Sequence, residues 1–459
     1  MKWIYAILIF SVLVLFHEFG HFLFAKLNGV EVEEFSFGFG PRLLSTVHNG
    51  TRYSLKLLWF GGSCLMKGMY EEGEEDEFYT EDGREMSFRE AVGLLAEKER
   101  TPEPGSFNSV SIGRRAAIIF AGPLFNFLLA FFCAVIVTGT VGYDPAVITS
   151  VEEGSPAAEA GLKAGDVVTS FMGSTIRVGR ELSDWNTFHS LQENETVSMK
   201  VQRDGETLDL SFTPEVITYM RIGITYQPDD GQAYVLSVVE QSPLAEAGIK
   251  AGDVITAIDG TEIASGQAMS EYFSAHPLTD APVTISFLRN GTVSEAEVTP
   301  VAQTSIHLGY TYNGTNTREK TSAINVIKYS FIEIDYWIRL VLNSLKGMFT
   351  GLFTVDDLSG PVGIVDTVGQ TYESVKDDGT LLILMNMLYL VIMLSANLGV
   401  MNLLPIPALD GGRLLFLLIE AVRGKPMNKR AEMITQVITV VLLLTLMIYV
   451  MFHDISRLL

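Results

Sequence analysis

Three residues near the start of the chain have the types and the spacing of a metal site. His17, Glu18 and His21 form the pattern His-Glu-x-x-His. Residues four apart lie on one face of an α-helix, so both imidazoles can bind a single zinc ion. Glu18 lies beside them and can accept a proton from the attacking water. The pattern predicts a zinc-dependent hydrolase with His17 and His21 as ligands and Glu18 as the catalytic base.

The surroundings of this motif are those of a membrane helix. Residues 3–27 form an apolar run about as long as the roughly 20 residues that span a bilayer. Histidine and glutamate inside such a helix cost several kcal/mol unless they are paired or functional. About 14 apolar residues precede His17, which places it about 20 Å into the bilayer, nearer the cytoplasmic face. A cleaved signal peptide is the alternative, but the run continues past His21 without a clear small-x-small cleavage site, so we expect a retained helix.

A third ligand is expected from another membrane segment, because catalytic zinc sites usually have three protein ligands and an open position. The apolar run 381–404 is followed by Pro405, Pro407 and Asp410. The prolines end the helix, and unpaired backbone at this depth is tolerated only beside protein or water. Asp410 then lies at the depth of His17. The sequence predicts Asp410 as the third ligand and Zn²⁺ as the cofactor.

The orientation in the membrane follows from basic residues that flank the spans. Four apolar runs are long enough to cross a bilayer, at 3–27, 116–138, 381–404 and 434–452. Arg114 and Arg115 precede the second run, and four basic residues at 423–430 separate the third from the fourth. The positive-inside rule places both groups in the cytoplasm. Residues 141 to about 380 and both termini are then expected outside.

Composition excludes several classes of function. The net charge of −22 argues against nucleic acid binding, which requires basic surface. The only two cysteines of the sequence lie in different segments, Cys133 in the second apolar run and Cys64 in a loop, which argues against a disulfide framework and excludes a paired-cysteine metal site. An acidic run at 71–85 contains seven Glu and two Asp and is typical of a solvated surface without chemistry.

The external segment contains an internal repeat. Residues 155–168 return in closely similar form at 242–255, at an offset of 87 residues. This period is too long for a solenoid unit and predicts two small domains in tandem. Each copy starts a short helix at Ser-Pro and later has a hairpin turn, at Asp204-Gly205 or Asn290-Gly291. The pattern resembles the bacterial, circularly permuted PDZ domain, which implies a size filter, peptide capture by strand addition, or a purely architectural role.

Taken together, the motifs resemble the site-2 protease family of intramembrane zinc metalloproteases, in particular its bacterial RseP-type regulators of membrane stress. The resemblance covers nearly the whole chain, including 122–127 in the second span and 402–411 after the third. It implies cleavage of single-span membrane proteins in regulated intramembrane proteolysis. The implied substrates are an anti-sigma factor already trimmed outside, or remnant signal peptides. The implied location is the bacterial cytoplasmic (inner) membrane.

The resemblance also implies residues that bind the substrate. Four of them would shape the cleft: Asn397, Asn402, Pro405 and Pro407. For the two asparagines, hydrogen bonding between helices is the alternative. A hairpin containing Gly61 and Gly62 would dip toward the active site and offer an edge to an unwound substrate. Here the chain departs from the family, because Trp59-Phe60 and Ser63-Cys64 replace the usual Pro-Leu and Tyr-Val around the glycines.

The expected fold is a multi-pass α-helical membrane protein with four transmembrane helices, a membrane-associated β-hairpin region and two extracytoplasmic α+β PDZ domains. The transmembrane parts are expected at 1–28, 114–139, 380–412 and 431–453. Between them we expect the hairpin loop at 29–70, a cytoplasmic acidic loop at 71–113 and PDZ domains at 140–219 and 220–306. Segment 320–356 predicts an amphipathic helix, either on the outer membrane surface or packed against the PDZ pair.

Two functions from other classes remain as alternatives. One is a membrane PDZ receptor or chaperone with a vestigial metal site, against which the complete set of three ligands and a base argues. The other is a zinc transporter, which would need polar ligands along a path across the bilayer. The polar residues found here lie toward one side only.

Overall fold

The protein consists of two compact units. The computed structural model describes residues 2–69, 103–229, 231–239, 241–313, 318–425, 427 and 429–458. Met1–Asp144 together with Asn316–Leu459 form one unit, called here the helical unit. Pro145–Thr315 form the other, called here the repeat unit. The acidic run at 71–85 lies outside the described residues.

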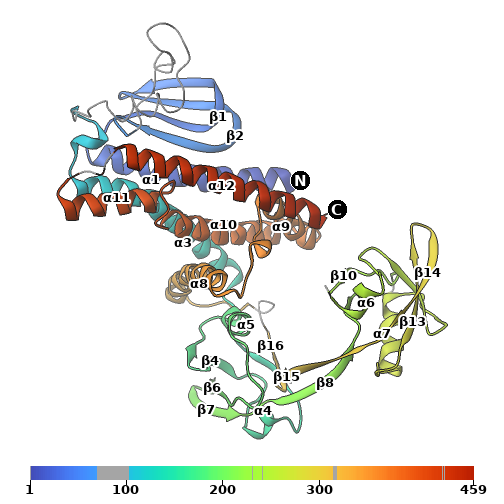
Figure 1. Ribbon diagram of the computed structural model, residues 1–459. Helices are drawn as coiled ribbons and strands as arrows, with labels where there is room; N and C mark the ends of the chain where they lie inside the picture. Colours follow the sequence, from blue (N-terminus) through green and yellow to red (C-terminus); the bar gives the residue numbers. More distant parts are fainter. Residues whose placement is uncertain are drawn as a thin grey trace. The chain divides into compact units, whose positions relative to one another are not determined.

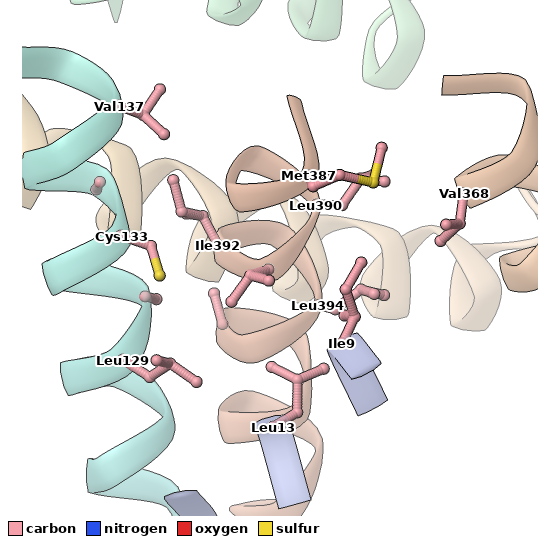
Figure 2. Packing of buried hydrophobic residues seen from close by; sticks show 14 of the residues in the cluster. Ile9, Leu13, Leu129, Cys133, Val137, Val368, Met387, Leu390, Ile392 and Leu394 are labelled. Carbon is pink, nitrogen blue, oxygen red and sulfur yellow. The ribbon is translucent and has the colours of Figure 1, made fainter. Parts of the chain in front are cut away.

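Four helices in the described part of the helical unit are long and apolar enough to span a membrane. They are α1 (Lys2–Leu27), α3 (Ile112–Val141), α10 (Thr380–Asn402) and α12 (Lys429–Leu458). Side chains of α1, α3, α10 and α9 (Pro361–Val375) share one apolar core. Figure 2 shows Leu13 of α1, Leu129 and Cys133 of α3 and Ile392 of α10 in this core.

Small residues bring α1 and α3 into close contact. A side-chain carbon at Gly20 of α1 would lie only 2.3 Å from the carbonyl oxygen of Ala121 in α3. Glycine at such positions lets helix backbones approach each other in membranes. The close approach places the histidines of α1 against the middle of α3.

The segment 380–412, expected as the third transmembrane helix with a metal-ligand loop, contains the end of one helix and the start of another. Helix α10 ends at Asn402, a turn holds Pro405 and Pro407, and α11 (Asp410–Arg423) begins at Asp410. The turn is tight, because a side-chain carbon at Gly411 would lie 2.2 Å from the carbonyl oxygen of Leu404. The prolines end the first helix, as the sequence analysis expected, and the apolar spacing after them starts a new helix. The search of the sequence for apolar runs long enough to cross a bilayer did not predict α11.

Helix α11 is held against α3 by a charged pair. Arg115 donates two hydrogen bonds to the carboxylate of Glu420, at 2.6 and 3.2 Å. Both side chains are largely buried, and a guanidinium fork facing a carboxylate fixes both distance and orientation. Arg115 therefore anchors the helix that carries Asp410, in addition to its expected role as a basic residue beside the second span.

The hairpin of β1 (Val32–His48) and β2 (Thr51–Met66) folds over on itself (Figure 1). Phe35 pairs with Cys64 on one side and with Tyr53 on the other, so residues 32–37 lie between two other segments. The bend uses Gly38 and Gly61, both at positive φ, with the Gly38 Cα hydrogen facing the carbonyl of Leu58. In the described part of the chain, residues 62–66 pair only with 32–37 and form an edge of the sheet.

Glu34 fastens the folded hairpin from inside. Its buried carboxylate accepts hydrogen bonds from Arg42 at 2.8 Å and from Ser54 at 2.5 Å, and Lys56 lies 3.3 Å away. The bonds from Arg42 are the main cause that lowers the pKa of Glu34 to about 2. Glu34 therefore stays ionised at neutral pH and holds three strand segments in register.

The repeat unit contains two sheets of the same strand order. In the first repeat the order is β5-β4-β6-β7, and in the second it is β12-β11-β13-β14. The first sheet comprises β4 (Val167–Phe171), β5 (Ser174–Thr175), β6 (Val197–Arg203) and β7 (Glu206–Phe212). The second comprises β11 (Val254–Ile258), β12 (Thr261–Glu262), β13 (Val283–Arg289) and β14 (Thr292–Val298). Each repeat has a helix beside its sheet, α5 (Gly179–Phe188) or α7 (Gly266–Ala275).

The two repeats exchange their last strands. Strand β9 (Ile224–Thr225) follows the first repeat but pairs with β10 (Ser237–Val238) of the second. Strand β16 (Tyr310–Tyr312) follows the second repeat but pairs with β3 (Ile148–Val151) of the first. The paired strands β8 (Glu215–Arg221) and β15 (Val301–His307) lead into these crossings.

This topology corrects the expected tandem boundaries of 140–219 and 220–306. Tyr310 is buried in the core of the first repeat, so the second domain is inserted into the first. The exchanged strands have similar sequences, Gly223-Ile224-Thr225-Tyr226 and Gly309-Tyr310-Thr311-Tyr312. Either strand can fill either position, and the sequence alone does not say which does.

The amphipathic segment forms α8 (Ala323–Thr350), which packs against α3 and α10. Large apolar side chains such as Ile324, Leu342 and Phe349 remain exposed. A helix with one face on the helical unit and an apolar exposed face suits a membrane interface. Its position at the membrane surface stays a prediction.

Candidate functional site

Three candidate ligand atoms converge where α1 meets the start of α11. Nε2 of His17 lies 3.1 Å from Oδ2 of Asp410, and Nε2 of His21 lies 3.3 Å from the same oxygen. The two Nε2 atoms are 3.2 Å apart. The spacing within the helix brings the imidazoles together, and the turn after α10 adds the carboxylate.

The triangle formed by these atoms has the size of one face of a zinc coordination tetrahedron. Zinc binds nitrogen and oxygen ligands at about 2.0–2.2 Å, which puts tetrahedral donors about 3.3 Å or slightly more apart. The donor set of two imidazoles and a carboxylate is also common for catalytic zinc. In size and chemistry the three residues fit this metal, and a water or substrate can take the remaining position.

The protonation of His21 supports the same conclusion. Nδ1 of His21 lies 2.9 Å from the carbonyl oxygen of Ile118, an atom that can only accept. In the neutral ring Nδ1 therefore carries the proton, and Nε2 then presents a lone pair to Asp410. Oδ2 of Asp410 is buried without a hydrogen bond from any described residue. Lone pairs that face one another in a buried site repel, and a cation bound between them would compensate this repulsion.

Glu18 lines the same cavity without being one of the three converging groups. The cavity has a volume of about 190 Å³. Its other lining residues include Cys64, Met66, Asn402 and Arg413. A carboxylate beside a metal site, in a cavity large enough for water and a peptide group, is positioned to accept and return a proton.

The edge of the hairpin lies against this carboxylate. A side-chain carbon at Gly62 would lie 3.8 Å from Cγ of Glu18. Cys64 and Met66 of the same edge line the cavity. A peptide added to this edge in extended form would pass beside Glu18.

The predicted substrate-binding residues divide into two groups. The structure brings Asn402 and Gly62 to the cavity or to Glu18. Asn397 has an exposed side chain on α10 and does not line the cavity. Pro405 and Pro407 belong to the turn before Asp410, and Gly61 packs against the ring of Phe39.

Helix α3 contributes residues that the sequence analysis did not assign to the site. A side-chain carbon at Gly122 would lie 2.4 Å from Nε2 of His21 and 2.7 Å from Cε1 of His17, so both imidazoles rest on bare backbone. Pro123 next to it leaves the carbonyl of Ile119 without its helical donor. Asn126, one turn later, lies 3.1 Å from Nδ1 of His17. The only signal for these residues was that 122–127 matched a family motif.

Replacing Gly122 with alanine is expected to lower zinc content and cleavage together. The added carbon must push both imidazoles away, and their contacts with Ile118 and Asp410 leave no room to move without loss of the triangle. Gly139→Ala in the same helix is the matched control, because its nearest neighbour would be 3.8 Å away. Elemental analysis and a cleavage assay on both variants provide the measurement. Normal zinc content in Gly122→Ala would show that the imidazoles do not depend on this contact.

Comparisons with known proteins agree with this chemistry. The model of peptidase family M50 matches residues 5–446. Zinc metalloprotease RasP of Bacillus licheniformis is 31% identical over 464 residues, covering 98% of each chain. Regulator of sigma-E protease RseP of Salmonella typhimurium is 30% identical over 481 residues, again covering 98% of each. The solved PDZ domain of HtrA3, bound to a phage-derived ligand, matches 20% of this chain and 92% of its own at 22% identity, with a TM-score of 0.17.

Proposed function

Because this chain belongs to peptidase family M50 and is a zinc metalloprotease, we propose that it cuts single-span membrane proteins within or close to the bilayer. The observation that carries this proposal is the position of His17 and Glu18 inside an apolar helix of membrane-spanning length. Asp410, in the turn and helix that follow another such helix, lies 3.1 Å from His17. A protease with its centre there acts on peptide bonds that are in or near the membrane.

Zinc held by His17, His21 and Asp410 would supply a Lewis acid that polarises the scissile carbonyl and activates water. Glu18 takes the proton from the attacking water as it adds to the carbonyl carbon. The same carboxyl group then gives the proton to the leaving amine when the peptide bond breaks. Burial of the site keeps bulk water from competing with these transfers.

The substrate needs an extended backbone at the site, since a helix hides its peptide bonds. The edge at residues 62–66 can hold such a segment by main-chain hydrogen bonds. Asn402 lines the cavity and can hydrogen-bond a substrate peptide group. Asn397, Pro405 and Pro407 act at most indirectly: Pro405 and Pro407 shape the turn that positions Asp410, and Asn397 is available to a neighbouring helix.

The proposed setting is regulated intramembrane proteolysis in a bacterial cytoplasmic membrane. One relative is named a regulator of sigma-E protease, which favours an anti-sigma factor as substrate, with remnant signal peptides as the second class. The repeat unit would lie outside the cytoplasm and limit access to the site, by size or by peptide capture. The segment 141–306, which contains most of the repeat unit, has a net charge of −16 from 24 acidic and 8 basic residues, and this charge disfavours acidic external domains.

A comparison of substrates that differ only outside the membrane tests this proposal. Purified protein is given a single-span substrate with either a folded external domain or the same span trimmed to a short tail. We expect the trimmed substrate to be cut faster, with no product from a Glu18→Gln variant. Equal rates for both substrates would contradict access control by the repeat unit. Cleavage restricted to the external domain would contradict an intramembrane site.

A further inference from the structure

We infer that Asn126 is a positioning residue that fixes the tautomer and the orientation of His17 through a hydrogen bond to Nδ1. Its side-chain amide lies 3.1 Å from Nδ1 of His17, on the side of the ring opposite Asp410. Asn126 is fully buried, and His17 is nearly so. The inference rests on the proposed ligand set of His17, His21 and Asp410 and adds a fourth residue that does not touch the metal.

The amide is held in place from the far side. Ser395 of α10, also fully buried, donates a hydrogen bond of 2.8 Å to the backbone carbonyl of Asn126. Gly122, one turn earlier on α3, is in contact with both imidazoles. The backbone that carries Asn126 is therefore fixed on both sides, and its side chain has a defined place against His17.

Both histidines then need a hydrogen-bond acceptor at Nδ1, and a different residue supplies it for each. Nε2 of His17 must present a lone pair to bind metal, so Nδ1 must carry the proton and needs an acceptor. For His21 that acceptor is the carbonyl oxygen of Ile118. For His17 only the amide of Asn126 is at hydrogen-bond distance of Nδ1 among the described residues.

The lone pair that His17 needs at Nε2 indicates which end of the amide acts. Nδ2 of Asn126 is the atom nearest to His17, and Oδ1 is a buried oxygen without a partner among the described residues. A half-turn of the amide exchanges the two atoms and places Oδ1 where it can accept the Nδ1 proton that a metal-binding Nε2 requires. Metal ligands of the histidine type usually donate their second nitrogen to such an acceptor. Asn126 in this orientation makes Nε2 of His17 the metal-binding nitrogen.

Three variants in the full-length protein test this assignment. Asn126→Leu removes the acceptor at similar volume and is expected to weaken zinc binding about 10–100-fold. Asn126→Asp keeps an acceptor and removes the donor, so zinc affinity should stay at or above that of the wild type. Asn386→Leu on α10 is the matched control, because among the described residues that amide hydrogen-bonds within its own helix, to the carbonyl of Leu382. Zinc affinity is measured by chelator competition, and the Co²⁺ absorption spectrum reports ligand geometry.

The outcomes distinguish a failure of this inference from a failure of the proposed ligand set on which it rests. Unchanged zinc affinity and an unchanged Co²⁺ spectrum in Asn126→Leu would overturn it, and so would an equal loss in Asn126→Asp. If Asp410→Asn loses zinc in the same experiment, the ligand set stands while the role of Asn126 fails. Melting curves check that each variant folds. If Asn126→Leu does not fold, Asn126→Asp decides alone, with retained affinity in support and lost affinity against.

Discussion

Replacing Glu18 with glutamine is expected to abolish peptide-bond cleavage while zinc remains bound. Glutamine has nearly the same shape but cannot accept the proton of the attacking water or return it to the leaving amine. Loss of a general acid and base costs about 10²–10⁴-fold in rate, which brings turnover to the limit of detection. The three converging donor atoms belong to His17, His21 and Asp410, so metal content should not change.

The control for Glu18→Gln is the same substitution at a glutamate outside the site. Glu31→Gln serves, because Glu31 pairs with Lys67 at a largely exposed position. Cleavage is followed with a single-span substrate, and zinc is measured by elemental analysis. Substantial turnover by Glu18→Gln would remove Glu18 from the mechanism. Loss of zinc in the same variant would instead make Glu18 part of the metal site.

Replacing Asp410 with asparagine is expected to remove zinc and activity together. The carboxylate is the only anionic member of the triangle, and its Oδ2 is the atom that both imidazoles face. Loss of a ligand should cost more than the roughly 10–100-fold in affinity that follows from loss of a supporting contact. At ordinary zinc concentrations the variant should be isolated without metal.

A buried aspartate elsewhere in the helical unit provides the control. Asp454 of α12 accepts hydrogen bonds from the backbone of Gly360 and Gly363 at the start of α9. Asp454→Asn is expected to loosen α12 and to keep zinc, since this carboxylate holds a helix end. Full zinc content in Asp410→Asn would show that the third ligand is another group.

The convergence of His17, His21 and Asp410 could be predicted because each of these residues has a local signature. Two histidines four apart share a helix face whatever the helix packs against. Asp410 followed from its depth, since proline ends its helix near the level of His17. The donor atoms in the structure lie 3.1–3.3 Å apart, as one metal requires.

The contribution of α3 could not be predicted in this way. Gly122 and Asn126 meet the histidines only because α1 and α3 cross at Gly20, and spacing within either helix does not specify that crossing. The exchange of β9 and β16 between the two repeats could not be predicted for a related reason. Sequence similarity between two strands shows that they are equivalent and leaves open which sheet each joins.

Identifying the bond that is cut tests the central claim most directly. Purified zinc-loaded protein is incubated with a trimmed single-span substrate, and the products are measured by mass spectrometry. The account predicts a cut within or next to the apolar segment, lost on zinc chelation, restored by added zinc and absent with Glu18→Gln. A cut far outside the apolar segment, or a cut that survives chelation and the loss of Glu18, would contradict an intramembrane zinc protease.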